Sequence, residues 1–326
     1  MRHRAGPSAV LPHNGRLSFP PHQRDGRFFN PGATGPRGLP SVVKWKLTSR
    51  REPSPKLIPV KPSIPPASVD SPSLLTTLVN HSTLLLQQPG SNILTDPIWS
   101  LRCSPLSFIG PRRHRLPGVE FHHLPPIHTV LLSHNHFDHL DLPTLRRLSA
   151  RGGSLFVVPL GVARFLESHG IAPAHQLDWG DSLAVPGATI HAVPAFHFSG
   201  RGLFDRDRTL WCSYIIESAF GMVYFAADTG FGPHFAWVRE RFGSPRLALL
   251  PIGAYEPRWF MSPIHMNPEE ALEAHRILGA ATSIAIHHGT FQLADDAVDT
   301  PRRRLLACAP ADSFLLLDNG GSALLT

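Results

Sequence analysis

The pattern of apolar positions beyond residue 70 predicts strands first and then an alternation of strands and helices. Two apolar runs, 74–79 and 83–87, flank a short polar turn and predict a β-hairpin, and 92–95 predicts the next strand. Further runs of strand length lie at 129–132, 189–193, 222–225 and 283–286. Short apolar runs bounded by polar or turn residues are typical of buried strands. The pattern therefore predicts an α/β fold.

Helices are predicted where capping residues flank the apolar positions. The expected helices lie at 145–148, 162–168 and 235–242, with glycines closing the last two. Asn267 and Pro268 supply an N-cap and an N1 proline for a helix that runs to Gly279, which assigns Glu269 and Glu270 to capping rather than to catalysis. At the end of the chain, 313–317 and 323–325 are joined through Asn319-Gly320-Gly321 and predict a closing hairpin.

One polar hexapeptide, directly after the run at 129–132, gathers four metal-binding side chains. It reads His134-Asn135-His136-Phe137-Asp138-His139. Three imidazoles and a carboxylate would be costly to desolvate together unless a cation bound them. Asp141 and Pro143 then predict the start of a helix. The hexapeptide is therefore expected on a loop between a strand and a helix, at the usual rim of an α/β active site.

The spacing inside the hexapeptide predicts two ions. His134 and His136 can converge on one ion from an extended loop, whereas Asp138 and His139 point elsewhere and can serve a neighbouring ion. Hydrolytic sites use two ions, about 3.5–4 Å apart, to make a hydroxide and to hold both oxygens of a displacement.

Three isolated polar residues extend this ligand set, because each follows an apolar run. His197 comes after the run at 189–193, Asp228 after 222–225, and His287 after 283–286. Asp228 is suited to bridge two cations, since a carboxylate has two oxygens and a negative charge. Taken alone, Asp228 could equally be a turn or cap residue, and His197 and His287 could be buried hydrogen-bonded histidines.

The hexapeptide followed by His, Asp and His resembles the metallo-β-lactamase fold superfamily. More narrowly, the chain resembles the N-acylphosphatidylethanolamine-hydrolysing phospholipase D family and its bacterial relatives over roughly residues 70 to 295. The stretches that carry this resemblance are 94–97 (LTDP), 104–111 (SP through GP), 132–136 (LSHNH), 227–230 (ADTG) and 251–261 (PIGAYEPRWFM). The last stretch is specific to the family rather than to the fold.

The resemblance implies a four-layer αββα sandwich and a role for each ligand. It implies that one metal is held by His134, His136 and His197, that the other is held by Asp138, His139 and His287, and that Asp228 bridges them. Two Zn²⁺ ions are expected, with Mn²⁺ or Fe²⁺ as alternatives. His265 matches a family histidine beside the substrate phosphate, so the expected catalytic residues are Asp138, Asp228 and His265.

Other residues beside the ligands affect this assignment. Asp96, Asp141 and His81 could orient ligand imidazoles, or could be a strand-end turn, a helix cap and a buried histidine. Three departures from the family pattern are Asn80 before His81 in place of glycine, Phe137 in place of a mammalian tyrosine, and His288 in place of an aromatic residue. They leave the substrate open, and His288 could exchange roles with His287.

Length and charge divide the chain into a leader and a hydrolase domain. Residues 1 to 61 contain 12 Lys or Arg against two acids, so the remainder has 19 basic and 22 acidic residues. We therefore expect a basic, proline-rich extension at 1–70 and one domain at 71–326. Without a secretory signal or a metal-binding cysteine motif, a reduced, cytoplasmic location is expected, with the inner face of the membrane as an alternative.

The extension and the function each leave alternatives. The extension could wrap the domain or attract an anionic membrane surface, and nucleic-acid binding is not expected because no recognisable binding fold accompanies the charge. The expected partner is a phospholipid or another phosphodiester substrate, and a homodimer is an open alternative. Besides a phospholipase D, the sequence allows a lactonase on the same fold or, less readily, a non-catalytic metal-binding protein.

Overall fold

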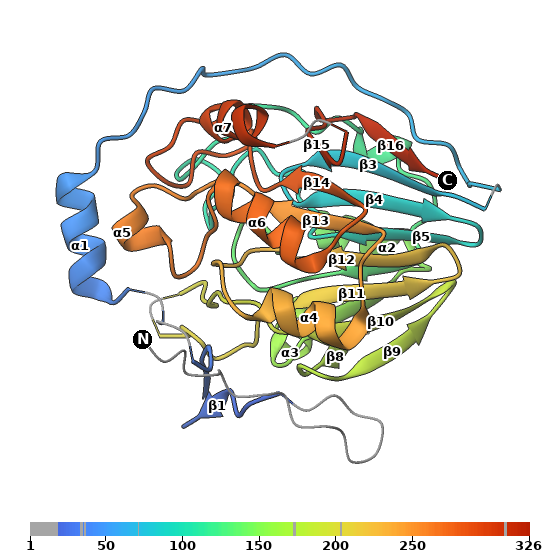
Figure 1. The fold of residues 1–326 in the computed structure, drawn as a ribbon, viewed down its shortest axis with the longest axis horizontal. Coiled ribbons are helices and arrows are strands. Elements are labelled where there is room, and N and C mark those ends of the chain that lie inside the picture. The colour runs from blue at the N-terminus through green and yellow to red at the C-terminus, as the bar shows by residue number, and fades with distance from the viewer. Residues whose placement is uncertain are drawn as a thin grey trace.

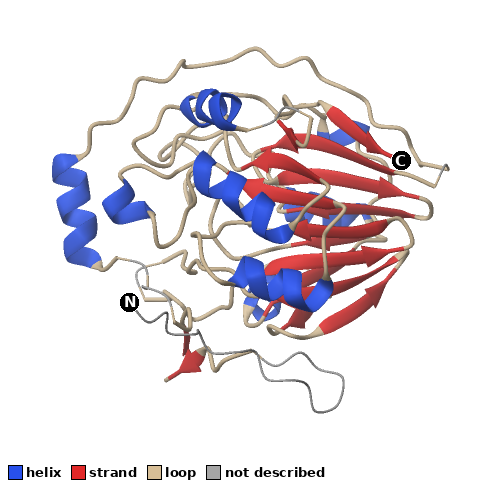
Figure 2. Ribbon diagram, in the orientation of Figure 1, coloured by secondary structure: helices blue, strands red, loops and turns tan. Residues whose placement is uncertain are grey.

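The computed structural model describes residues 19–326 except 33, 34, 36, 71, 172, 173, 203, 310 and 311. Two seven-stranded sheets pack face to face, and helices cover their outer faces (Figures 1 and 2). The structure is therefore the four-layer αββα sandwich of the metallo-β-lactamase fold. In the described part of the chain, no helix combines the length and the apolar character that a membrane span requires.

The first sheet contains the predicted hairpin and the strand before the hexapeptide. Its strand order is β16-β3-β4-β5-β6-β7-β8. The bounds are β3 Leu74–Asn80, β4 Thr83–Gln88, β5 Ser91–Thr95, β6 Thr129–Leu131, β7 Leu155–Pro159, β8 Ala174–Leu177 and β16 Ser322–Leu325. Strand β4 is antiparallel to β3 and β5, while β5, β6 and β7 are parallel. Strands β3, β5 and β6 therefore run in one direction and end at the same edge.

The second sheet has the order β15-β14-β13-β12-β11-β10-β9. The bounds are β9 Ser182–Val185, β10 Ala188–Val193, β11 Ser213–Ser218, β12 Gly221–Phe225, β13 Leu247–Pro251, β14 Thr282–Ile286 and β15 Phe314–Leu315. Strand β11 is antiparallel to β10 and β12, and β12, β13 and β14 are parallel. Strands β10, β12 and β14 therefore also end at one edge.

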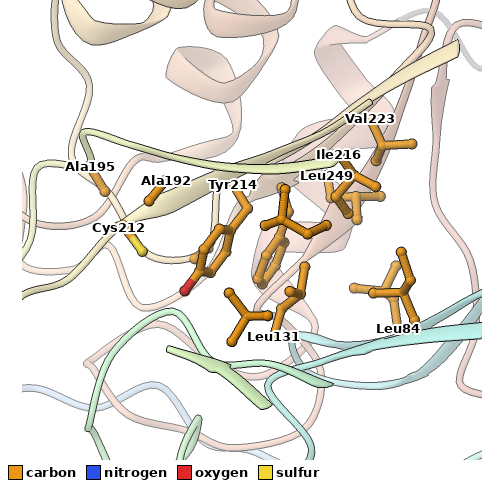
Figure 3. Close-up of a cluster of buried hydrophobic side chains, with 14 of the residues drawn as sticks. Leu84, Leu131, Ala192, Ala195, Cys212, Tyr214, Ile216, Val223 and Leu249 are labelled. Atoms are coloured by element: carbon orange, nitrogen blue, oxygen red, sulfur yellow. The ribbon is translucent and has the colours of Figure 1, made fainter. Parts of the chain in front are cut away.

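Three apolar layers hold the sandwich together. The central layer lies between the sheets, where Leu84 and Leu131 of the first sheet meet Tyr214, Ile216 and Leu249 of the second (Figure 3). Such burial of apolar surface is the main force that stabilises a fold of this size. The outer layers lie under helices α2 (Leu142–Arg151) and α3 (Val162–Glu167) on one side, and under α4 (His234–Phe242), α6 (Pro268–Leu278) and α7 (Thr300–Cys308) on the other.

The predicted capping of α6 is confirmed. The Asn267 side chain accepts a hydrogen bond from the Glu270 backbone N–H, and the Glu270 carboxylate accepts one from the Asn267 N–H. Gly279 ends the helix in the left-handed conformation. Reciprocal bonds of this kind satisfy backbone donors that the first helical turn leaves unpaired. Glu270 also forms an ion pair with Arg258, which anchors the short helix α5 (Arg258–Met261) beside α6.

The predicted C-terminal hairpin is wrong. Strand β15 pairs with β14 in the second sheet, while β16 pairs with β3 in the first. The glycines between them permit close backbone packing rather than a two-strand turn. A Cβ atom on Gly118 would lie 1.9 Å from the Gly320 nitrogen, and the Gly320 N–H donates to the Leu78 carbonyl. Local turn chemistry cannot reveal this crossover, because its partners lie some 200 residues away.

The described part of the N-terminal extension wraps the domain. It contains the short strands β1 (Gln23–Arg24) and β2 (Arg27–Phe28) and helix α1 (Leu39–Thr48), and its later part runs along the domain to β3 (Figure 1). The Trp45 indole donates to the Asp295 carboxylate at 3.0 Å, and the Glu52 N–H donates to the Asp295 carbonyl. The extension also contacts the domain at Asn30, whose side-chain amide donates a hydrogen bond to the His197 carbonyl.

Candidate metal centre

All predicted ligands reach one edge of the sandwich, because they follow strands that end there. The hexapeptide follows β6, His197 follows β10, Asp228 follows β12 and His287 follows β14. His81 and Asp96 follow β3 and β5 at the same edge. Several of these residues or their neighbours have left-handed backbones: φ is 48° at His81, 32° at Asp96, 53° at Ala227 and 54° at His287. Such conformations are uncommon outside glycine and often occur at functional sites.

The first donor group consists of three imidazoles. His134 Nε2 lies 2.8 Å from His136 Nδ1, which lies 3.2 Å from His197 Nε2. Ligand atoms on one zinc ion are about 3.3 Å apart in a tetrahedral site with bonds of about 2.0–2.1 Å. His134 and His197 are almost fully buried. The three nitrogens therefore have the spacing of ligands around a single ion.

The second donor group contains Asp138, His139 and His287. Asp138 Oδ2 lies 3.2 Å from His139 Nε2 and 3.3 Å from His287 Nε2. His81 Nε2 approaches the same oxygen at 3.0 Å. His81 thus belongs to this group geometrically, either as the hydrogen-bond donor that orients Asp138 or as a further ligand.

Asp228 lies between the two groups. Its Oδ2 atom is 3.1 Å from both His139 Nε2 and His287 Nε2 in the second group. The same oxygen is 4.0 Å from His134 Nε2 and 3.7 Å from His197 Nε2 in the first. Its Oδ1 atom is buried without a hydrogen-bond partner. A carboxylate so placed has the position that a bridging ligand requires.

Asp96 fixes the ring orientation of one histidine in each group. Its carboxylate accepts from the Ser133 N–H at 2.7 Å and the Ser133 hydroxyl at 2.6 Å, and lies 2.7 Å from His139 Nδ1. Because the Ser133 hydroxyl donates to Asp96, its oxygen is free to accept from His134 Nδ1, 2.9 Å away. Both Nδ1 atoms then hold the proton, and both Nε2 lone pairs face the centre. A carboxylate that orients ligand imidazoles in this way is common in metal sites.

The electrostatics of the centre require positive charge. Although burial raises the pKa of Asp138 and of Asp228, their histidine neighbours outweigh it and hold both well below the ordinary value. Burial lowers the pKa of His287, but Asp228 and Asp138 outweigh it and raise the pKa to about 9. The pKa of His139 is likewise raised well above its ordinary value. Its Nε2 atom faces two carboxylates and has no hydrogen-bond partner. A lone pair directed at buried carboxylates is unfavourable without a cation, so the residues fit metal ions.

The first group behaves differently, because it consists of neutral imidazoles. Burial lowers the pKa of His136 to about 3 and that of His197 to about 4, and neighbouring histidines add to the shift at His136. Neutral imidazole is the form that binds a metal. His197 also keeps its ring in place through Nδ1, which donates to the Ile264 carbonyl at 3.0 Å.

His265 lies over both groups. Its ring centroid is 5.1 Å from that of His197 and 5.2 Å from that of His287. Burial lowers the pKa of His265 well below its ordinary value, and its Nδ1 atom has no partner. His265 also comes close enough to His197 and Asp228 to form a donor group with them. Its neutral imidazole can therefore meet a bound substrate or a metal.

The departures from the family pattern lie beside the ligands. His288 is buried, and among the described residues it belongs to no donor group, so the geometry favours His287 as the ligand. Phe137 packs against the Arg201 guanidinium, which is 3.8 Å from the ring centroid. Asp141 stands at the N-cap position of α2 but makes no side-chain capping bond; its carboxylate accepts hydrogen bonds from the Ser100 and Thr144 hydroxyls.

Sequence reasoning missed Ser133 and Arg201. Ser133 connects Asp96 to His134, and its position directly before the hexapeptide was the available signal. Arg201 donates to the carbonyls of Asn135 and Leu140 at 2.7 and 2.9 Å, and so clamps both ends of the hexapeptide loop. No local pattern marks Arg201, since its partners lie more than 60 residues away.

The fold and the donor groups define the class of protein as a metal-dependent hydrolase of the metallo-β-lactamase fold. A family model, the beta-lactamase superfamily domain, matches residues 91–288. The chain belongs to this superfamily. A solved structure of isothiocyanate hydrolase from Delia radicum gut bacteria has a similar fold, with a TM-score of 0.62 and 22% identity over 76% of this chain and 98% of that one.

Two relatives resemble the chain more closely in sequence. An uncharacterised protein of Mycobacterium tuberculosis is 40% identical over 299 residues, which cover 89% of this chain and 80% of the relative. The N-acyl-phosphatidylethanolamine-hydrolyzing phospholipase D 1 of Caenorhabditis elegans is 37% identical over 231 residues, which cover 68% of this chain and 65% of that enzyme.

Proposed function

We propose that the protein is a dinuclear zinc phosphodiesterase that cleaves N-acylphosphatidylethanolamine-like phospholipids on the head-group side. The observation that carries this proposal is the pair of donor groups that share Asp228, with His265 beside both. The nematode phospholipase D supports the substrate class, because it shares more than a third of the matched residues. The products would be phosphatidic acid and an N-acylethanolamine.

The proposed ligands form two sets, one of imidazoles only and one of imidazoles with a carboxylate. His134, His136 and His197 would hold one zinc ion, Asp138, His139 and His287 the other, and Asp228 both. When bound, two zinc ions supply a water-derived nucleophile at neutral pH and neutralise charge on phosphoryl oxygens. Nitrogen and carboxylate donors without cysteine are typical of catalytic rather than structural zinc sites.

The remaining groups of the chain would orient the substrate. His265, as a neutral imidazole, can donate a hydrogen bond to a phosphoryl oxygen. Asp96 would keep the His139 ring fixed directly and the His134 ring through Ser133 while the substrate binds. Phe198, in contact with the His136 ring at 4.5 Å between centroids, gives the centre an apolar wall. An apolar wall next to a charge-binding centre suits a phosphodiester that bears acyl chains.

The test is turnover of N-acylphosphatidylethanolamine in mixed micelles by protein of measured zinc content. His265→Ala is expected to lower turnover about 100-fold while two zinc equivalents remain, since the imidazole acts on the substrate. His191→Ala is the matched control, because this histidine pairs with Glu217 outside the centre. Loss of zinc from His265→Ala would make His265 a ligand instead.

The product identifies the bond that is cut. Mass spectrometry should find phosphatidic acid and N-acylethanolamine in equal amounts. Diacylglycerol or free fatty acid would contradict the bond assignment. Turnover of lactones but of no phospholipid by the fully loaded protein would replace the proposal with a lactonase on the same fold.

A further inference from the structure

Helix α1 exposes an apolar stripe that nothing in the described chain covers. Leu39, Val43 and Leu47 follow one another at four-residue intervals, and 73%, 51% and 81% of their surfaces are exposed. Residues four apart lie on one face of a helix. Trp45 faces the other way and is buried against Phe260, with the rings 5.0 Å apart. The helix is therefore seated on the domain by one face and presents apolar side chains on the opposite one.

Positive charge surrounds this stripe. Residues 37–56 contain six basic side chains, all exposed, and a single acid, Glu52. Glu52 is already engaged, because its carboxylate accepts hydrogen bonds from Thr300 and from the Ala297 N–H. Lys44 lies over the ring of the partly exposed Trp259, 4.9 Å from its centroid. A tryptophan and basic residues beside an apolar stripe are the composition of helices that lie in a membrane interface.

A second apolar projection is formed by loop 101–110. Leu101, Leu106, Phe108 and Ile109 are all exposed, and Phe108 exposes 75% of its surface. The loop has a closed base, because the Cys103 N–H donates to the Pro111 carbonyl and the Arg113 N–H donates to the Leu101 carbonyl. Its side chains are thus held out by a fixed base.

A cavity beside this loop is lined by basic side chains. Its volume is about 490 Å³, and its wall contains Leu101 and Phe137 together with Arg102, Arg146 and Arg201. The acid in its wall, Asp141, accepts from Ser100 and Thr144. Arginine side chains in such a cavity can bind phosphate groups.

Both projections adjoin the metal centre. Helix α1 packs on the segment that contains Met261 and Ile264, which leads directly to His265. The base of loop 101–110 packs through Cys103 on Phe291 and Phe137, the latter within the ligand loop. Leu293 contacts both of these apolar clusters, so they meet beside the centre.

We propose that α1 and loop 101–110 form a docking surface for an anionic bilayer, with their exposed apolar side chains inserted among the lipids beside the metal centre. The sequence suggested only a diffuse attraction by the basic extension; the structure assigns named side chains. Charge decides between this partner and a second copy of the chain, because two copies of the same basic surface would repel each other. The inference does not depend on which bond the enzyme cleaves.

The experiment measures binding of the full chain, loaded with zinc, to phosphatidylcholine vesicles with and without phosphatidylglycerol. Wild-type protein should sediment with the anionic vesicles and be released by salt. Leu39→Ser with Leu47→Ser, and separately Phe108→Ser, should each weaken binding about tenfold or more. Leu306→Ser, on a leucine of α7 that exposes 62% of its surface, is the matched control and should bind as wild type does.

Three results would overturn the proposal. These are no binding of wild-type protein to anionic vesicles, equal binding by the stripe variants, and a stripe variant that converts a dimer to a monomer without changing vesicle binding. Light scattering measures the last, which would assign the stripe to a second copy. Zinc content and thermal midpoint, both expected to match wild type because the changed side chains are exposed, separate loss of docking from loss of fold.

Discussion

The two donor groups lie side by side but hold charge differently. In the first group, three imidazoles with lowered pKa values face a carboxylate oxygen that is no closer than 3.7 Å to His134 or His197. In the second, two carboxylates lie within 3.3 Å of His139 and His287. Because attraction between opposite charges falls with distance, the second group should bind a cation more tightly. Similar donor types are therefore expected to give two sites of unequal strength.

The largest effect is expected when the shared ligand is removed. Asp228→Ala deletes the carboxylate that both groups approach, so zinc content should fall from two equivalents toward none, and turnover should drop below detection. Elemental analysis and a turnover assay on the same preparation measure both effects. Two retained equivalents would show that Asp228 is not a bridge.

The difference in strength predicts two stages of metal loss. Increasing chelator should remove one zinc equivalent well before the other, and the first to leave should come from the imidazole group. In Asp138→Asn, which deletes a charge from the second group only, the tightly held equivalent should be lost. Metal-content titrations with chelator check this. One simultaneous release of both ions in the wild type would contradict unequal sites.

A change at Asp96 should weaken both groups without deleting a ligand. Asp96→Asn removes the acceptor that orients His139 directly and His134 through Ser133, and changes to such partners weaken metal binding about 10-fold to 100-fold. Competition with a zinc-binding dye measures the two affinities. A loss confined to one group would contradict the shared orienting role, and Asp141→Asn, whose carboxylate contacts Ser100 instead, is the control for a buried aspartate near the loop.

The smallest effect concerns a histidine outside both groups. Burial lowers the pKa of His234 to about 3. A histidine with a depressed folded pKa contributes stability that is present above the unfolded value near 6.5 and is lost as the pH falls. Each pH unit below that value should cost about 1.4 kcal/mol. The difference in unfolding free energy between wild type and His234→Gln should therefore shrink between pH 7 and pH 5. A constant difference would mean that folding does not lower the pKa of His234.

The strands, and the placement of the candidate ligands at strand ends, were predictable because their signals are local. The apolar runs before the hexapeptide, His197, Asp228 and His287 all became strands, and the capping box at Asn267 formed. Apolar runs followed by polar residues, and capping residues at fixed spacing, are encoded within five or six neighbouring residues. Turn chemistry at Asn319-Gly320-Gly321 was misleading for the opposite reason, since the contacts of Gly320 with Leu78 and Gly118 are distant in sequence.

The sequence by itself determined which residue types could bind metal, their order along the chain and the sandwich that presents them. Only the tertiary structure decided that Asp228 lies between both groups, that Asp96 reaches histidines in each and that Arg201 clamps the ligand loop. Likewise, the sequence shows that the extension is basic. Which face of α1 is exposed, however, is decided by the packing of Trp45 on Phe260. Composition and periodicity describe what a segment can do, whereas the distances that set charge and exposure arise only when remote segments pack together.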